Sequence, residues 1–234
     1  MNNDLIMADE RKKLVQDIID RKKYTTYLEI GVFAGGVFFP VKAKRKIAVD
    51  PEFTFGKFKR TKKILKNLDN LKASYYEMPS DDFFKKEAAR LFTEKPVDIC
   101  LVDGMHEYHY ALRDVENTLD YLQKDGVIIM HDCNPQSAAE AISFEEWKNK
   151  NYEGNWNGDV WKTILHLRSL RKDICVFVLD VDYGLGIVCK RPPENMLSFT
   201  QAEIEKLTFN DFDKNREQWL NLKPMDYFYR FFNI

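Results

Sequence analysis

The chain has 234 residues, of which 36 are Lys or Arg and 37 are Asp or Glu, so its formal net charge is −1 at pH 7. Hydrophobic residues make up 44% of the chain, and it has only 10 Gly and 8 Pro. This balance excludes a disordered, collagen-like or low-complexity protein, and it excludes a chain whose overall charge attracts nucleic acid. The length is typical of one globular domain, which we expect to span 1–234.

The predicted elements alternate between helices and short apolar strands. Apolar residues recur at helical spacing in the first part of the chain, which predicts an N-terminal helix within 1–23. Strands are predicted at 27–30, 46–49, 73–76, 97–102 and 126–130, with helices at 57–68, 80–92 and 108–123 between them. The strands are apolar throughout rather than alternating, which is typical of a parallel sheet that is covered on both faces.

The C-terminal part adds a helix over 159–170 and two strands, 174–179 and 186–190, joined by a tight turn as in a hairpin. The whole pattern predicts an α/β protein with a doubly wound, mostly parallel sheet. We expect its core at 24–190 and a C-terminal extension at 191–234. Ligands bind such sheets beyond the carboxyl ends of the strands. Polar residues gather at those ends: Glu29 to Gly35, Asp50, Asp103 to His106, and His131 to Asn134.

Two further segments invite a specific interpretation. The long irregular stretch 135–158 carries Trp147, Tyr152 and Trp156, and long loops in compact domains are usually functional or disordered, so we predict a lid or substrate loop. The aromatic cluster from Tyr227 to Phe232 is too apolar for a free tail. We expect it to pack on its own domain or on a second copy, which would make the protein a homo-oligomer.

The cysteines and the N-terminus bear on the compartment. The four cysteines form no CxxC pair, which favours buried, reduced thiols over a disulfide framework or a zinc site. The N-terminal residues lack the apolar stretch of a signal peptide, and no apolar run has the length of a membrane-spanning helix. We therefore expect a cytoplasmic protein without a membrane span.

The first chemical motif is Glu29-x-Gly31-x-x-x-Gly35, at a predicted strand-to-helix turn. Glycines let the backbone pass close to a ligand, and the N–H groups of such a turn can hold a carboxylate or phosphate. The spacing differs from the dinucleotide-binding pattern G-x-G-x-x-G. Asp50 follows about 20 residues later, at the end of the next strand, where an acid can accept both hydroxyls of a ribose.

Together with these residues, three later motifs resemble the class I S-adenosylmethionine-dependent methyltransferases. More narrowly, they resemble a small-molecule O-methyltransferase-like group whose signature is D-G-x-H-x-Y, an Arg-Asp pair in the next helix, and G-G-x-x-x-x-H-D. The chain has Asp103-Gly-x-His106-x-Tyr108, then Arg113-Asp114, and GVIIMHD at 126–132, with Asp125 in place of the first glycine. The resemblance covers roughly 24–190 and implies a Rossmann-like sheet of seven strands with an antiparallel last strand.

The resemblance implies S-adenosylmethionine as the cofactor and assigns six residues to it: Glu29, Gly31, Gly35, Asp50, Ser80 and Asp103. The two glycines would pass under the methionine part of the cofactor, with Glu29 near its ammonium group. Asp50 would hold the ribose and Ser80 would lie near the adenine. Asp103 would lie below the reactive sulfonium.

A hydroxyl acceptor must also lose its proton, which requires a base or a metal ion. Asp103 and Asp132 offer the oxygen ligands that Mg²⁺ prefers, so these two acids are the candidate metal ligands. Without a metal, His106 or His131 would be the general base, since histidine titrates near neutral pH. We therefore take His106, His131 and Asp132 as the candidate catalytic residues, and the choice of base stays open.

The sequence thus predicts an S-adenosylmethionine-dependent enzyme that methylates an oxygen of a small polar acceptor, such as a sugar or a natural product. One alternative is a sugar-nucleotide-dependent glycosyltransferase that uses Asp180 and Asp182, although a tight turn ending at Gly184 also explains those acids. Another is a non-catalytic interaction module with the same fold.

The segment from Lys42 to Lys72 has eleven Lys or Arg against three acids. This excess of positive charge is compatible with a binding surface for an anionic substrate or with a solvated helix face. Few aromatic residues are interleaved with the cations, so we do not expect nucleic acid as a partner.

Overall fold

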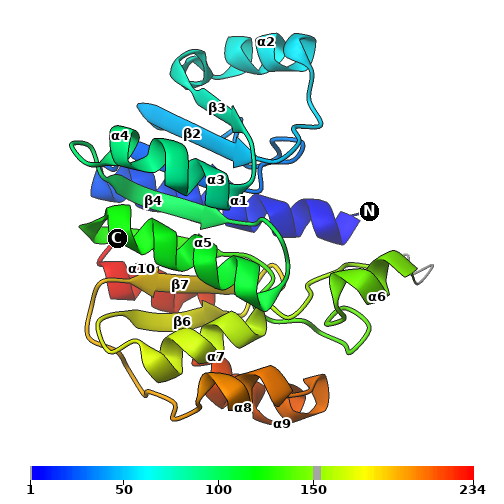
Figure 1. Cartoon of the computed structure of the whole chain (residues 1–234). Coiled ribbons are helices and arrows are strands. Elements are labelled where there is room, and N and C mark those ends of the chain that lie inside the picture. The colour runs from blue at the N-terminus through cyan, green and yellow to red at the C-terminus, as the bar shows by residue number, and fades with distance from the viewer. Residues whose placement is uncertain (1, 150–153) are drawn as a thin grey trace. The chain divides into compact units, whose positions relative to one another are not determined.

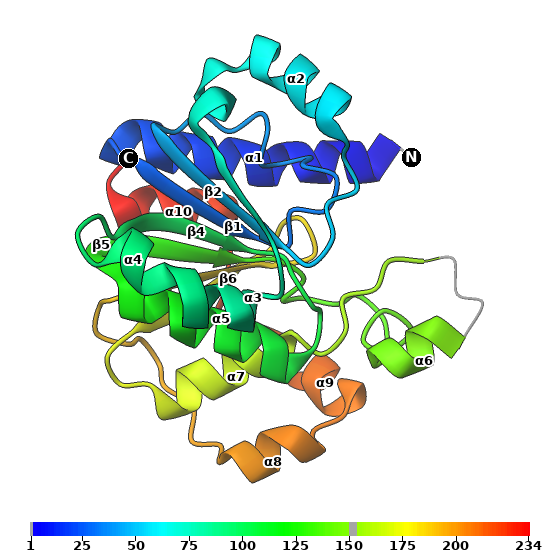
Figure 2. The same ribbon diagram turned by 45° about the horizontal axis from the view of Figure 1, so that its top comes forward.

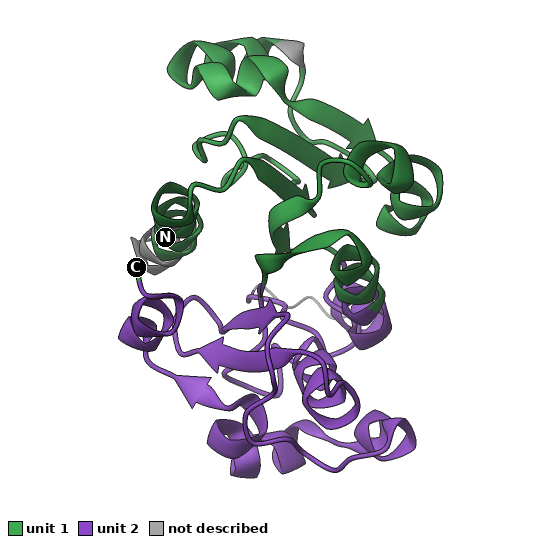
Figure 3. Cartoon of the chain, turned by 90° about the vertical axis from the view of Figure 1, so that its left-hand side faces the viewer, with its two compact units in different colours: residues 1–104, 113–128, 234 green, residues 105–112, 129–233 purple. Residues whose placement is uncertain are grey.

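The computed structural model describes residues 2–149 and 154–234, so Tyr152 of the predicted loop lies outside the described residues. The chain divides into two compact units, coloured separately in Figure 3. Unit 1 comprises residues 1–104, 113–128 and 234, and unit 2 comprises residues 105–112 and 129–233. Two elements cross this division, because helix α5 (Tyr108–Tyr121) begins in unit 2 and strand β5 (Leu122–Met130) ends there.

Unit 1 contains a parallel sheet of β1 (Thr26–Ile30), β2 (Arg45–Asp50), β3 (Ser74–Glu77) and β4 (Val97–Val102). The strand order is β3-β2-β1-β4, followed by β5. In the hydrogen-bonded register, Ile30 at the end of β1 lies beside Val49 of β2 and Val102 of β4. The residues that follow these strands therefore emerge at one edge of the sheet.

Helices cover both faces of the unit 1 strands. Figures 1 and 2 show α1 (Asn2–Lys22) on one face, and α3 (Ser80–Phe83) and α4 (Ala89–Phe92) on the other. A π-helical turn, η2 (Phe84–Ala88), separates α3 from α4, where the sequence predicted one continuous helix. The strand residues are accordingly buried, with every residue of β1 inaccessible to solvent or nearly so.

Unit 2 is built around an antiparallel hairpin of β6 (Cys175–Leu179) and β7 (Leu185–Cys189), which the sequence predicted. Asp182, Tyr183 and Gly184 in its turn all have positive φ angles, of 47°, 56° and 87°. A third strand, β8 (Leu222–Lys223), pairs in parallel with β6 and gives the order β7-β6-β8. The remaining elements are α6 (Phe144–Asn149), α7 (Trp161–Leu170), α8 (Gln201–Lys206), α9 (Phe209–Leu220) and α10 (Met225–Phe232).

The C-terminal aromatic cluster belongs to α10 and packs on its own unit. Phe228 and Phe232 are buried, and the ring of Phe177 in β6 lies 5.0 Å from the rings of both Tyr227 and Phe231. Figure 1 shows α10 and α7 on opposite faces of the unit 2 strands. The sequence led us to expect that this cluster packs on its own domain or on a second copy. The structure shows the first of these contacts, and a homo-oligomer formed through the cluster stays a prediction.

The fold class predicted from the sequence is confirmed. The described residues form a mostly parallel α/β sheet with an antiparallel hairpin in its C-terminal part, and with eight strands where seven were expected. The short strand β8 accounts for the difference. The four cysteines are buried, as predicted. Among the described helices, none combines the length and the apolar character needed to cross a bilayer.

The segment after β1 departs from the expected strand-to-helix turn, because residues 33–40 form a series of turns instead of a helix. Side chains hold this segment. Lys46 of β2 is fully buried, and its Nζ donates to the carbonyl oxygens of Phe38 and Val41 and to Oδ1 of Asn70, at 2.5, 2.7 and 2.6 Å. The Nδ2 groups of Asn67 and Asn70 also donate to backbone carbonyl oxygens of this part of the chain. Burial lowers the pKa of Lys46 to about 8.

We expect Lys46→Met to lower the free energy of unfolding by about 3 kcal/mol, because it removes a charged hydrogen-bond donor from three buried oxygen atoms. Urea denaturation followed by circular dichroism measures this change. Lys44→Met is the matched control, since Lys44 is exposed on the same stretch of chain and should change the value by less than about 0.5 kcal/mol. Equal stability of the two variants would contradict the structural role of Lys46.

Candidate functional site

The two motif glycines of unit 1 are required by close packing. Gly31 has a φ of +82°, and a Cβ atom there would lie 1.9 Å from the backbone oxygen of Asp103. Gly35 has a φ of +70°, and its Cβ would lie 2.4 Å from the ring of Phe39. A Cβ on Gly36 would meet nothing within 4 Å. The first turn therefore lies directly against the end of β4, and the backbone at Gly36 faces open space.

Asp50 ends β2 and holds the same turn. Its Oδ2 accepts a hydrogen bond from the backbone N–H of Phe33 at 2.7 Å, and its Oδ1 accepts one from the N–H of Glu52 at 2.8 Å. A carboxylate oxygen can accept two hydrogen bonds. The buried Asp50 carboxylate is thus fixed in place while each of its oxygens keeps the capacity to accept a ligand hydroxyl.

Asp103 follows β4 and forms an ion pair with a residue that the sequence did not single out. Nη1 of Arg11, on α1, lies 2.7 Å from Oδ2 of Asp103, and the Arg11 side chain is largely buried. The backbone N–H of Asp103 donates to the oxygen of Ile30 at 2.8 Å. Arg11 is the first of three consecutive cations in a charged helix, so nothing in its sequence context distinguishes it from its neighbours.

Glu29 lies within β1 and is almost completely buried, and the Tyr27 hydroxyl donates a hydrogen bond to its carboxyl group. The pKa of Glu29 is raised to about 8, mainly by burial and in addition by the negative charge of Asp103, while the Tyr27 hydrogen bond acts in the opposite direction. Glu29 is therefore mostly protonated at neutral pH. A cationic ligand group placed beside it would favour the carboxylate form.

Ser80 is the first residue of α3 and interacts with a buried acid on α5. Burial raises the pKa of Asp114 to about 7, and a hydrogen bond with the Ser80 side chain acts in the opposite direction. Next to this pair, the exposed side chains of Arg113 and Asp81 form an ion pair at 2.9 Å. The Arg-Asp pair of the sequence motif thus contacts the start of α3 through both of its residues.

The three candidate catalytic residues meet in unit 2. Oδ2 of the buried Asp132 lies 3.1 Å from Nδ1 of His106 and 3.0 Å from Nδ1 of His131. The Asn157 side-chain amide donates to Oδ1 of Asp132. On its other side, His131 faces the hairpin turn, where its Nε2 lies 3.4 Å from Oδ1 of Asp182. Asn157 is a contact that sequence reasoning missed, because it lies in an irregular segment without periodicity.

The orientation of His106 indicates its tautomer. Its Nδ1 also lies 2.6 Å from the carbonyl oxygen of Trp156, and the two rings are stacked with centroids 5.1 Å apart. Both neighbours of Nδ1 are acceptors, so Nδ1 carries the proton and the lone pair of the neutral ring is on Nε2. At Gly158, a Cβ atom would lie 1.6 Å from the His106 oxygen. The segment predicted as a lid therefore fixes His106 from two directions.

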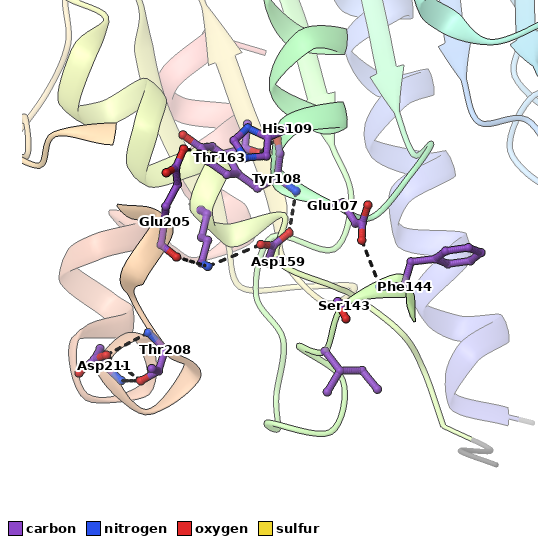
Figure 4. Close-up of polar contacts among 12 residues, drawn as sticks. Glu107, Tyr108, His109, Ser143, Phe144, Asp159, Thr163, Glu205, Thr208 and Asp211 are labelled. Carbon is purple, nitrogen blue, oxygen red and sulfur yellow. Dashed lines mark hydrogen bonds and ion pairs between the residues drawn. The ribbon is translucent and has the colours of Figure 1, made fainter. Parts of the chain in front are cut away.

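A cavity of about 400 Å³ opens in unit 2 near the start of α5. Its walls come from Glu107 to Tyr110, the segment before and within α6, the start of α7, and the turn between α8 and α9. Asp159 accepts a hydrogen bond from the backbone N–H of Tyr108 at 2.6 Å, and Glu107 accepts one from Phe144 at 3.2 Å (Figure 4). The volume is within the usual range for small-molecule sites.

Other polar residues considered from the sequence have structural partners. Nδ2 of Asn134 donates to Asp180 at 3.1 Å, and its Oδ1 accepts from Arg216. His166 is hydrogen-bonded to the Tyr108 hydroxyl at 2.6 Å. The predicted Mg²⁺ site takes Asp103 from unit 1 and Asp132 from unit 2, and it stays a prediction.

Comparisons with known proteins bear on the family and on the fold. A family model described as a methyltransferase domain matches residues 28–133, slightly less than half of the chain. No curated protein sequence matches the chain. The resemblance stated from the sequence is thus supported over residues 28–133, where the chain is similar to a methyltransferase domain.

Solved structures show the same fold at low sequence identity. The O-methyltransferase TomG from Streptomyces achromogenes, in complex with SAM, has a TM-score of 0.59 and 13% identity over 77% of this chain and 79% of that one. A putative caffeoyl-CoA O-methyltransferase from Staphylococcus aureus has a TM-score of 0.58 and 14% identity over 77% and 83%. An O-methyltransferase from Bacillus cereus in complex with SAH has a TM-score of 0.56 and 12% identity over 77% and 81%.

We predict a pH-dependent difference in stability between the wild-type protein and Glu29→Gln. The folded protein holds the Glu29 proton more tightly than the unfolded chain, so this group's contribution to the free energy of unfolding falls as the pH rises from about 4.5 to about 8. The fall is on the order of a few kcal/mol, since one pKa unit corresponds to about 1.4 kcal/mol. Urea denaturation at several pH values measures it. A variant with the same pH dependence as the wild type would contradict the prediction.

Proposed function

We propose that this protein transfers a methyl group from S-adenosylmethionine to an oxygen atom of a small polar acceptor, such as a sugar or a natural product. The observation that carries the proposal is the position of Gly31, Asp50 and Asp103, which follow or end three neighbouring parallel strands in register. All three lie within the segment that matches a methyltransferase domain.

The residues of unit 1 fit both ends of this cofactor. Asp50 would hold the ribose hydroxyls, because backbone N–H groups keep its carboxylate in position and its oxygens can accept further hydrogen bonds. At the other end, the methionine part has an ammonium and a carboxylate group. Glu29 and Asp103 would lie near the ammonium, and the positive charge of Arg11, which is paired with Asp103, would attract the carboxylate. Ser80 stays a weaker candidate near the adenine.

In unit 2, His106 is the residue best arranged to take the acceptor proton. When bound, S-adenosylmethionine supplies a methyl group on a positively charged sulfur, which becomes a neutral thioether when the acceptor oxygen forms its bond to the methyl carbon. His106 accepts the hydroxyl proton at Nε2, and Asp132 holds the ring by its Nδ1–H. His131 lies between two carboxylates and is suited to hold Asp132 in place.

A magnesium ion on Asp103 and Asp132 is the second route to an ionised hydroxyl, since a cation lowers the pKa of a bound alcohol. The cavity of unit 2 is the proposed binding site for part of the acceptor. The glycosyltransferase alternative needs Asp180 and Asp182 to bind one metal ion together. It is not favoured, because Asp180 accepts a hydrogen bond from Asn134 while Asp182 faces His131.

We expect the wild-type protein to bind S-adenosylhomocysteine in isothermal titration calorimetry, and Asp50→Ala to weaken this binding by about 100-fold or more, because both ribose contacts are lost. Glu52→Ala is the control, since only the backbone N–H of this exposed residue contacts Asp50. Titrations with magnesium and with a chelator test the second route. A wild-type protein that binds no S-adenosylhomocysteine in either buffer would refute the proposed function.

We expect Arg11→Met to weaken S-adenosylhomocysteine binding by about 10- to 100-fold and to leave binding of 5′-deoxy-5′-methylthioadenosine within about twofold, because the second compound lacks the amino-acid carboxylate. Lys13→Met, on the same turn of α1, is the control, since the Lys13 ion pair stays within the helix. If Arg11→Met weakens both ligands equally, Arg11 acts only by positioning Asp103.

A further inference from the structure

The connection between β2 and β3 exposes an unusual set of side chains. It consists of α2 (Lys57–Lys66) and the 3₁₀ helix η1 (Leu68–Lys72). The relative exposures of its large apolar residues are 74% for Phe58, 77% for Leu65, 71% for Leu68 and 66% for Leu71. Single exposed apolar residues are common on protein surfaces, but four within one short connection are not.

The buried side of this connection is polar, which reverses the usual pattern of a surface helix. Asn70 is fully buried and Asn67 nearly so, and both donate to carbonyl groups of the segment after β1. Arg60 lies over the Tyr75 ring, with its guanidinium carbon 3.8 Å from the ring centroid. These contacts fix the orientation of α2 and η1. The leucines face solvent because the asparagines are buried on the opposite side and the half-buried Arg60 is held against Tyr75.

Lysines accompany the exposed apolar residues. Lys62, Lys66 and Lys72 are exposed on the same connection, and Nζ of Lys62 lies 4.4 Å from the centroid of the Phe58 ring. We name Phe58, Leu65, Leu68 and Leu71, together with these three lysines, the lysine–leucine surface. It combines protruding apolar side chains with positive charge, and the acids Asp50, Glu52 and Asp69 are the only ones between Lys42 and Lys72.

We propose that the lysine–leucine surface binds an anionic lipid bilayer. Apolar side chains that protrude from a basic helix enter the boundary between headgroups and acyl chains, while lysines contact the anionic headgroups. A second copy of the chain fits less well, because a two-fold contact would bring the lysines of one copy against those of the other. Nucleic acid would use the lysines and leave the leucines in water. The surface is independent of the proposed methyl transfer, and it lies wholly within unit 1.

The test is co-sedimentation of the full-length protein with vesicles of phosphatidylcholine, with and without phosphatidylglycerol. We expect binding at least tenfold stronger to the anionic vesicles, and weakening of that binding at high salt. The double variants Leu65→Ser/Leu68→Ser and Lys62→Gln/Lys66→Gln should each lose about tenfold or more. Leu170→Ser is the matched control, because Leu170 is an exposed leucine of α7 in unit 2.

Thermal unfolding checks that the variants are folded, and unchanged melting temperatures are expected because the substituted side chains are exposed. Three results would overturn the proposal. The first is that the wild-type protein does not bind anionic vesicles. The second is that Leu170→Ser loses as much binding as the surface variants. The third is that light scattering shows a dimer that the substitutions Leu65→Ser/Leu68→Ser dissociate. The last result would make a second copy the occupant of this surface.

Discussion

A single buried ammonium group, that of Lys46, organises much of unit 1. Its three hydrogen bonds join the segment after β1 to the 3₁₀ helix before β3, through Phe38, Val41 and Asn70. A buried charge is costly unless it is hydrogen-bonded, so the positions of these three acceptors are constrained by the ammonium group. The same contact therefore supports the glycine turn on one side and sets the outward orientation of the leucines on the other.

The candidate residues fall into two groups of different chemical character. Those of unit 1 are acids and an arginine around two glycines, suited to a ligand with a ribose at one end and an amino acid at the other. Those of unit 2 are imidazoles and carboxylates in alternation, suited to moving or holding a proton. The D-G-x-H motif crosses from the first group to the second, since Asp103 belongs to unit 1 and His106 to unit 2.

The sequence predicts the parallel strands well because they are buried on both faces, and runs such as Val97–Val102 therefore read as apolar throughout. It also predicts that the acids at the ends of these strands emerge at one edge of the sheet, because the carboxyl ends of parallel strands lie side by side. It does not predict Arg11, whose role depends on a contact 92 positions away, or β8, whose two residues are too few to show a period. The absence of a helix after Gly31 depends on Lys46 and the asparagines, which no local pattern of that segment contains.

The burial of Lys46 also makes it a kinetic reporter. An amine reagent can acetylate this lysine only when the segment after β1 moves away, whereas the exposed Lys44, two residues earlier, is always accessible. The ratio of the two labelling rates, read by mass spectrometry, therefore gives the fraction of time that the glycine turn spends open. A ligand bound against that turn would slow the labelling of Lys46 and leave the labelling rate of Lys44 unchanged as an internal reference.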